Sequence, residues 1–120
     1  MTALRTVMNS KIHRATVTEA DINYIGSITI DSNLIEAANI MEWEKIEVLN
    51  ITNGSRLETY VIPGERGSGQ VCINGAAAHL VHPGDLVILV TYKSIEEQYL
   101  EEHVPTIIHV NSLNEITETH

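Results

Sequence analysis

Cations are scarce in this sequence, with only 7 Lys or Arg among 120 residues, so each is a candidate anion-binding group. Lys11 and His13 are two residues apart in a strand-like stretch and share one face. Arg56 and Tyr60 share a strand face in the same way, and Thr59 points to the opposite face. Arginine and lysine bind carboxylates, which makes both positions possible anion sites. Protective charges on an edge strand and a cross-strand ion pair of Arg56 explain the same residues without a ligand.

Two short segments could bring their backbone close to a ligand. Asn74 and Gly75 form a turn before Ala76–Ala78, whose small side chains leave N–H groups open to a carboxylate. A helix start with small packing residues explains this segment equally well. The pair Gly26 and Ser27 precedes a β-branched stretch, and by composition it is a turn that enters a strand.

Neither the histidines nor the single cysteine form a recognisable metal motif. His79 and His82 have a helical spacing, but Pro83 disfavours a helix there. Cys72 lies in a short apolar strand, where we expect a buried and unreactive thiol. Three other histidines are scattered along an acidic tail, where we expect them to be solvated: His103, His109 and His120. We therefore expect no metal at the functional site.

The elements that must position these residues are mostly strands. Short β-branched segments separated by turn residues predict a mainly β fold, a small barrel or sandwich with a few short helices. Asn53-Gly54 predicts a hairpin, because both residues tolerate positive φ. The expected strands are residues 5–14, 27–30, 45–51, 55–62, 70–73, 86–90 and 106–111.

The helices, turns and chain end are predicted from capping and turn residues. Thr18–Asp21 is a helix-starting box, and Asp31 or Ser32 could cap a second helix. Ser94 could start a short acidic helix, and Pro63-Gly64 is a turn signal. We expect the end of the chain to be a frayed tail.

Composition excludes several classes of function. The chain has 16 Asp or Glu against 7 Lys or Arg, so it lacks the basic footprint of a nucleic-acid binder or of a protein that binds anionic membranes. No apolar run reaches the ~18 residues of a bilayer span, and the N-terminal segment has no signal-peptide core. We therefore expect a cytoplasmic protein, with the length of one domain.

Six segments in order give a more specific indication. They are Arg5–Thr18, Tyr24–Ser27, Thr52–Tyr60, Glu65–Ser68, Asn74–Ala78 and Gly84–Asp85. In this order and spacing, from about residue 4 to 93, the chain resembles the pyruvoyl-dependent aspartate 1-decarboxylase family. The resemblance implies a double-psi β-barrel with a few short helices, formed by residues 1–120 as one domain. It also implies a homotetramer with active sites between subunits.

The resemblance further implies that the chain makes its own cofactor. The hydroxyl of Ser27 would attack the carbonyl of Gly26, and the resulting ester would eliminate and hydrolyse. The products would be residues 1–26 and a chain of residues 27–120 that begins with a pyruvoyl group. Thr59 matches the position whose hydroxyl helps to bind the Gly26 carbonyl during this self-cleavage.

The implied reaction converts L-aspartate to β-alanine and CO2 through a Schiff base with the pyruvoyl group. It needs no metal and no pyridoxal phosphate, and β-alanine would supply pantothenate and coenzyme A biosynthesis. Tyr60 matches the proton donor, and Arg56 and Lys11 match the cations that hold the two substrate carboxylates. The matching substrate contacts are Thr59, Gly75, Ala76 and Ala77, and the supporting positions are His13, Tyr24 and Asn74.

Two other classes of function remain open at this level. A catalytically idle barrel could keep Arg56 and Lys11 to bind a small anion while Gly26-Ser27 stays uncleaved. Alternatively, the acidic residues near the end of the chain could recruit a basic partner, which would make the protein an interaction module.

Overall fold

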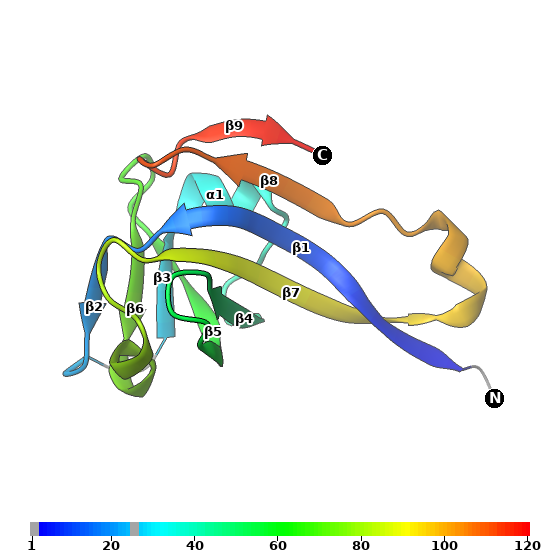
Figure 1. The fold of residues 1–120 in the computed structure, drawn as a ribbon. Coiled ribbons are helices and arrows are strands. Elements are labelled where there is room, and N and C mark those ends of the chain that lie inside the picture. Colours follow the sequence, from blue (N-terminus) through cyan, green and yellow to red (C-terminus); the bar gives the residue numbers. More distant parts are fainter. Residues whose placement is uncertain (1–2, 25–26) are drawn as a thin grey trace.

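A nine-stranded sheet dominates the computed structural model, which describes residues 3–24 and 27–120 (Figure 1). Its strand order is β2-β6-β3-β5-β4-β7-β1-β8-β9. The strands are β1 (Leu4–Thr16), β2 (Glu19–Asp21), β3 (Ser27–Asp31), β4 (Lys45–Asn50), β5 (Arg56–Gly64), β6 (Val71–Asn74), β7 (Leu86–Glu96), β8 (Thr106–Val110) and β9 (Ile116–Thr119). The helices are short: α1 (Ser32–Ala37) and the 3-10 helices η1 (Gly75–Leu80) and η2 (Glu97–Glu102). None of the helices in the described ranges is long and apolar enough to cross a bilayer.

Two ψ-shaped motifs build the sheet. The consecutive strands β5 and β6 lie on either side of the earlier strand β3, parallel and antiparallel to it respectively. In the same way β7 and β8 flank β1, antiparallel and parallel to it. Backbone hydrogen bonds outside the ladders join the two motifs. The Val17 N–H donates to the Asp85 carbonyl, and the Val17 carbonyl accepts the Gly84 N–H. The Thr18 N–H donates to the Val71 carbonyl. The fold is thus mainly β, as the residue patterns predict, and it is the double-psi barrel that the family resemblance implies.

An aliphatic core fills the barrel. Ile46, Val48 and Asn50 alternate with less buried residues along β4, as the period of a strand requires. Each fully buried aliphatic side chain contributes about 1.5–3 kcal/mol of transfer free energy. The largest of these side chains are Ile12, Ile28, Ile30, Leu34, Ile46, Ile73, Leu89 and Ile108.

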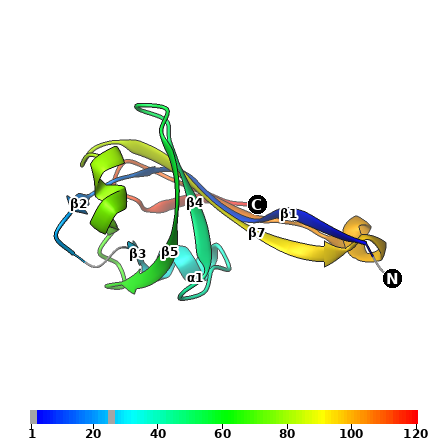
Figure 2. The same cartoon turned by 90° about the horizontal axis from the view of Figure 1, so that it is seen from below.

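Beyond the barrel, β1 and β7 continue as a two-stranded arm (Figure 1, Figure 2). Their antiparallel register runs from Thr16↔Leu86 out to Leu4↔Glu96, and the molecule is accordingly elongated, with extents of 45 × 29 × 25 Å. The helix expected from Ser94 begins later, at Glu97, because β7 keeps pairing with β1 up to Glu96. The arm leaves apolar side chains exposed, among them Leu4 and Tyr92.

The helix expected at Thr18–Asp21 is wrong. Residues Glu19–Asp21 form β2, which pairs in parallel with β6. The hydroxyl of Thr18 donates to the Val71 carbonyl (3.1 Å) and accepts the Val71 N–H (3.0 Å), so it joins two strands instead of capping a helix. A tertiary contact has overridden a local capping signal.

The turn expected at Pro63-Gly64 is also wrong, because both residues belong to β5 and pair with Ile30 and Asp31. The ladder with β4 ends at the pair Lys45↔Tyr60, so β4 does not need the N–H group that Pro63 lacks.

The end of the chain is a strand rather than a frayed tail. β9 pairs antiparallel with β8, and the preceding turn is held by the buried side chain of Asn114. Its Oδ1 accepts the Thr16 N–H (2.8 Å), and its Nδ2 donates to the carbonyls of Thr16 (2.8 Å) and Gly69 (2.7 Å). These contacts link the last hairpin to both ψ motifs.

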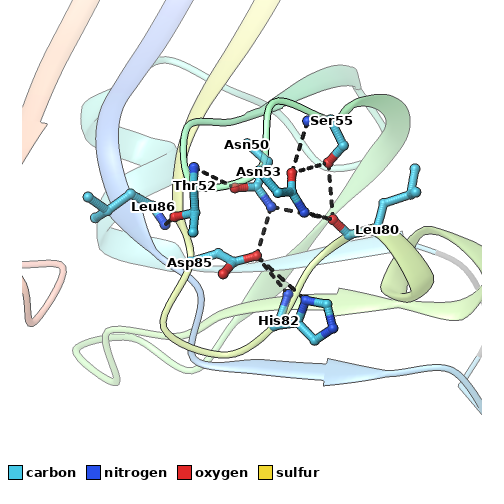
Figure 3. A network of polar contacts seen from close by, with 8 residues as sticks. All are labelled: Asn50, Thr52, Asn53, Ser55, Leu80, His82, Asp85 and Leu86. Atoms are coloured by element: carbon cyan, nitrogen blue, oxygen red, sulfur yellow. Dashed lines mark hydrogen bonds and ion pairs between the residues drawn. The ribbon is translucent and has the colours of Figure 1, made fainter.

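A buried carboxylate anchors the turn before β7 (Figure 3). Asp85 is 8% exposed, and its Oδ2 accepts hydrogen bonds from Asn50 Nδ2 (2.8 Å) and the His82 N–H (2.9 Å). The hydrogen bond from the Asn50 side chain, followed by the one from the His82 amide, holds the pKa of Asp85 below its ordinary value. The ionised form of Asp85 is therefore the one that this turn stabilises.

The same network ties η1 to the hairpin between β4 and β5 (Figure 3). The Leu80 carbonyl, at the end of η1, accepts hydrogen bonds from Asn53 Nδ2 (3.0 Å) and Ser55 Oγ (3.1 Å). Gly54 has φ +78°, which glycine adopts without strain, and so the Asn53-Gly54 hairpin forms as expected. The network fixes where the small residues at the start of η1 lie relative to β5.

We expect Asp85→Asn to lower the free energy of unfolding by about 1–3 kcal/mol at pH 7, the usual range for a buried charged hydrogen-bond acceptor. Because the folded-state pKa of Asp85 is depressed, its contribution is present above the unfolded-state pKa and is lost as the pH falls through the folded-state pKa. The difference between wild type and variant should therefore shrink as the pH falls below about 4.

Urea denaturation at fixed protein concentration, over a series of pH values, measures this difference. Glu101→Gln, an exposed change on η2, is the matched control and should leave the curve unchanged. A difference between wild type and Asp85→Asn that does not vary with pH would contradict the role of the carboxylate.

Candidate active site

Ser27 is the first residue of β3, and its side chain is held by a neighbouring strand. The residue is 2% exposed and lies opposite Asn74 of β6. Asn74 Nδ2 donates to Ser27 Oγ (3.1 Å) and to Thr29 Oγ1 (3.1 Å). The Ser27 oxygen is thus a hydrogen-bond acceptor, which leaves its own proton free to be given to another group.

Cys72 orients this amide, a role that the sequence analysis missed. Cys72 Sγ donates to Asn74 Oδ1 (3.1 Å) inside the fold. Burial, and then the charges of Glu19 and Asp21, raise the pKa of the Cys72 thiol to about 11, so the thiol remains a donor at neutral pH. Because Oδ1 is occupied in this way, Nδ2 is the end of the amide that faces Ser27. The positions 72 and 74, two apart on one strand, were the available signal.

Tyr60 lies on the strand next to Ser27. The parallel register begins at Ile28 and Val61, both fully buried. Ser27 and Tyr60 directly precede this pair, so both lie at the same end of the ladder and on the opposite face. The ring of Tyr60 stacks on Trp43, with ring centres 5.8 Å apart and planes at 27°. This contact restricts the position of the Tyr60 ring.

Thr59 points away from Tyr60, as expected. It pairs with Ile46, a residue of the core, whereas Tyr60 pairs with the exposed Lys45. Gly26, whose carbonyl Thr59 is expected to contact, lies outside the described residues. That contact stays a prediction.

The small-residue segment follows Asn74 directly. Gly75 begins η1 with φ +71°, a conformation that favours glycine, and it is buried. Ala76 is exposed and Ala77 is half-buried. The backbone at this point is therefore close to Ser27 and is covered by little side-chain volume.

Next to these residues is a hollow of about 440 Å³ whose lining includes Tyr24, Thr29, Cys72 and Asn74. Tyr24 itself is 61% exposed. Acidic side chains also line this hollow, namely Glu19, Asp21 and Glu65. They would repel a dianion, so this hollow disfavours a dicarboxylate.

Lys11 and His13 lie apart from Ser27 in the order of the strands. Both lie on β1, which is four strands away from β3 in the sheet. Lys11 alternates with the buried Ile12, so it lies on the outer face of the barrel, as Ser27 does.

Arg56 lies on the same strand as Tyr60 but further from Ser27 along it. It lies at the start of β5, four residues from Tyr60, or roughly 13 Å along the strand. Its side chain is 73% exposed, and its Nη1 is 3.7 Å from Glu47 Oε1. The cross-strand ion pair that the sequence left open is therefore present, but at this exposure it holds Arg56 only weakly.

His13 lies on β1 between two cations, Lys11 and Arg14, but is itself uncharged. Burial, and then the electrostatic influence of Lys11, His109 and Arg14, lower the pKa of His13 below its ordinary value, so the ring is neutral at pH 7. Its Nδ1 is buried and finds no hydrogen-bond partner among the described residues. The ring centres of His13 and His109 are 5.1 Å apart.

The expectation that the histidines of the acidic tail are scattered is wrong. The ring of His109 lies 5.3 Å from that of His120, because β8 and β9 pair. His103 Nε2 forms a hydrogen bond with the Met8 carbonyl at 2.7 Å. The hairpin of β8 and β9, which the sequence analysis did not predict, brings His109 and His120 together.

Comparison with known proteins places the chain in one family. The sequence profile described as aspartate decarboxylase matches residues 3–117. A protein named aspartate 1-decarboxylase from Corynebacterium efficiens is 56% identical over 113 residues, which cover 94% of this chain and 83% of that protein. Proteins of the same name from Heliobacterium modesticaldum (58% over 112 residues, covering 93% and 85%) and Acetivibrio thermocellus (57% over 111 residues, covering 92% and 88%) are similarly close. The chain therefore belongs to the aspartate decarboxylase family.

Proposed function

We propose that this chain is an aspartate 1-decarboxylase, which converts L-aspartate to β-alanine and CO2 with a pyruvoyl group made from its own Ser27. Family membership supports the reaction. The observation that carries the choice of Ser27 is its buried hydroxyl oxygen, which accepts the Asn74 amide at the start of β3. The β-alanine made from aspartate in the cytoplasm would supply pantothenate and coenzyme A biosynthesis.

Self-cleavage would begin with attack of Ser27 Oγ on the Gly26 carbonyl, which moves the acyl group from nitrogen to oxygen. β-Elimination would then release residues 1–26 as a carboxylate and leave dehydroalanine at position 27. Addition of water and loss of ammonia would leave a pyruvoyl group there. Ser27 fits this role because Asn74 holds Oγ without using its proton, and because Thr59 lies on the neighbouring strand. Donors near the carbonyl stabilise the oxyanion of such an attack.

In the decarboxylation, the pyruvoyl group supplies an electron sink for the charge left by CO2. The residues of the chain would hold the substrate and move the proton. The substrate would approach the backbone of Gly75, Ala76 and Ala77 closely, because the side chains of this segment are small. Tyr60 would donate a proton from a ring position set by Trp43. Asn74, His13 and Tyr24 would support this arrangement.

The two carboxylates of aspartate need two cations, and we infer that these come from a neighbouring subunit. Lys11 lies on β1, four strands from β3 in the sheet order, and the Arg56 side chain is 73% exposed. A second copy could bring its own Lys11 and Arg56 against the Ser27–Tyr60 surface. The projecting arm, with exposed Leu4 (63%) and Tyr92 (46%), provides apolar area for such an assembly, which we propose is a homotetramer.

Intact-mass spectrometry after warm incubation tests the origin of the cofactor. The wild type should split between Gly26 and Ser27, and the larger fragment should be lighter by one ammonia than a chain that starts with serine. Ser27→Ala should stay at a single uncut mass. Ser68→Ala, at a turn outside the site, is the matched control and should split as the wild type does. Wild-type protein that stays uncut even with cell extract added would favour the idle anion-binding barrel.

Tyr60→Phe tests the proton donor. Self-cleavage should stay largely intact, and β-alanine formation should slow by about 10²-fold or more, the usual scale for a lost general acid. The cleaved fraction is read from the mass spectrum and β-alanine by chromatography. The control Tyr99→Phe, on η2, should match the wild type. Unchanged turnover in Tyr60→Phe would remove this residue from the proposed role.

Complementation tests whether the site is shared between subunits. Ser27→Ala and Lys11→Ala chains should each be nearly inactive alone. Co-expressed, they should regain about one quarter of the wild-type activity, because random pairing of subunits joins an intact Ser27 side to an intact Lys11 side in a quarter of the sites.

The control for complementation is Ser27→Ala co-expressed with Tyr60→Phe. Both changes lie on the same side of the proposed site, so this mixture should be no more active than Tyr60→Phe alone. If Ser27→Ala and Lys11→Ala chains copurify, as their different masses would reveal, and yet no activity returns, then the shared site is wrong.

A further inference from the structure

The hairpin of β8 and β9 presents three metal-ligating side chains on one face. His109 pairs directly with Glu118, and the backbones of Ile107 and His120 exchange hydrogen bonds of 2.9 and 2.7 Å. Ile108, which alternates with His109, is fully buried, so His109 lies on the outer face of the barrel. Glu118 and His120, two residues apart, share that face.

The side chains already converge. Ligand atoms of His109, Glu118 and His120 all lie within 4.8 Å of one another. His120 Nε2 is 2.8 Å from Glu118 Oε2, and the ring centres of His109 and His120 are 5.3 Å apart. Two imidazoles on one tetrahedral zinc ion have their ring centres about 5 Å apart, given a Zn–N bond of roughly 2.0–2.1 Å. Small side-chain rotations would therefore suffice to close this group on a single ion.

The surroundings hold the hairpin in place. The turn that connects β8 and β9 is anchored through buried Asn114 to Thr16 of β1 and to Gly69, between β5 and β6. The ring of His13 packs edge-on against that of His109, at 62° between planes, and limits its orientation. A neighbour that orients a ligating histidine strengthens a metal site. The site is thus built on paired strands rather than on a loose chain end.

Charge near the hairpin is mixed. Glu118 supplies one negative charge to the group, and Lys11 and Arg14 of β1 lie on the strand next to β8. These cations disfavour a site that relies on charge alone, as a calcium site of carboxylates does. Imidazole nitrogens bind by coordination and suit zinc, for which two histidines and one carboxylate are an established ligand set.

We propose that His109, Glu118 and His120 bind one Zn²⁺ ion per protomer, with water in the fourth position. The ion would link β8 to β9 and so stabilise the last hairpin. None of the three ligands belongs to the proposed decarboxylation site, and this inference does not depend on that function.

Zinc binding by tag-free protein, stripped of metal with a chelator, tests the proposal. Calorimetric titration with ZnCl2 should give one equivalent per protomer. His109→Ala and His120→Ala should each weaken zinc binding at least 10-fold. The loss of a residue that only supports a ligand usually costs about that much, and the loss of a ligand should cost no less. His82→Ala, with a side chain that is 76% exposed and far from the hairpin in sequence, is the matched control and should bind as the wild type does.

A third variant keeps the test decisive if a histidine change disturbs folding. Glu118→Gln preserves the shape of an exposed side chain and removes its charge, so it should fold normally by circular dichroism and still bind zinc more weakly. Self-cleavage at Ser27 should be unaffected in all these variants, which separates this site from the proposed function. The proposal would be overturned if the wild type showed no saturable zinc binding, or if Glu118→Gln and His109→Ala bound zinc as tightly as the wild type. It would also be overturned if His82→Ala weakened binding as much as the changes at the proposed ligands.

Discussion

The insertion of β3 between β5 and β6 is the constraint on which the candidate active site depends. It sets two registers at once, one parallel and one antiparallel. The antiparallel register places Asn74 opposite Ser27, and the parallel register brings Tyr60 beside it. A shift of one residue in either pairing would turn a core side chain such as Ile28 outward and a site residue inward, which the buried face opposes strongly.

Buried carboxylates secure the two chain crossings that this topology needs. Asp85 holds the turn before β7, and Asp31 holds the connection from β5 to β6. Asp31 accepts the N–H groups of Asn33 (2.8 Å), Gly67 (3.0 Å) and Gly69 (2.8 Å). Burial alone would raise the pKa of Asp31, but these three hydrogen bonds, aided by Arg66, lower it. Acid should therefore loosen the crossings before it affects the aliphatic core.

The outer face of the barrel divides into regions with different chemistry. One contains Ser27, Tyr60 and the small-residue segment, and another contains Lys11, on a strand four places from β3 in the sheet order. A third, on β8 and β9, carries the histidine group. In the function that we propose, a neighbouring copy supplies the cations, so this chain need not place its own Lys11 beside Ser27.

Much of the fold could be predicted from local residue patterns. Alternation along β4, the Asn53-Gly54 hairpin and the cap of α1 by Asp31 need no distant partner, and the structure contains all three. The errors occurred where a distant contact outweighs a local signal. Thr18 bonds to Val71 instead of capping a helix, and Asn114 reaches Thr16 and Gly69 to hold a hairpin that looked like a tail.

For the site, the sequence by itself determined the residue types, their shared strand faces and the resemblance to a family. Only the tertiary structure decided which of these residues meet. It joined Cys72, Asn74 and Ser27 into one hydrogen-bonded chain, left Lys11 four strands away, and gathered His109 and His120. The physical reason is that strand periodicity is local, whereas register and strand order follow from burial of the whole sheet.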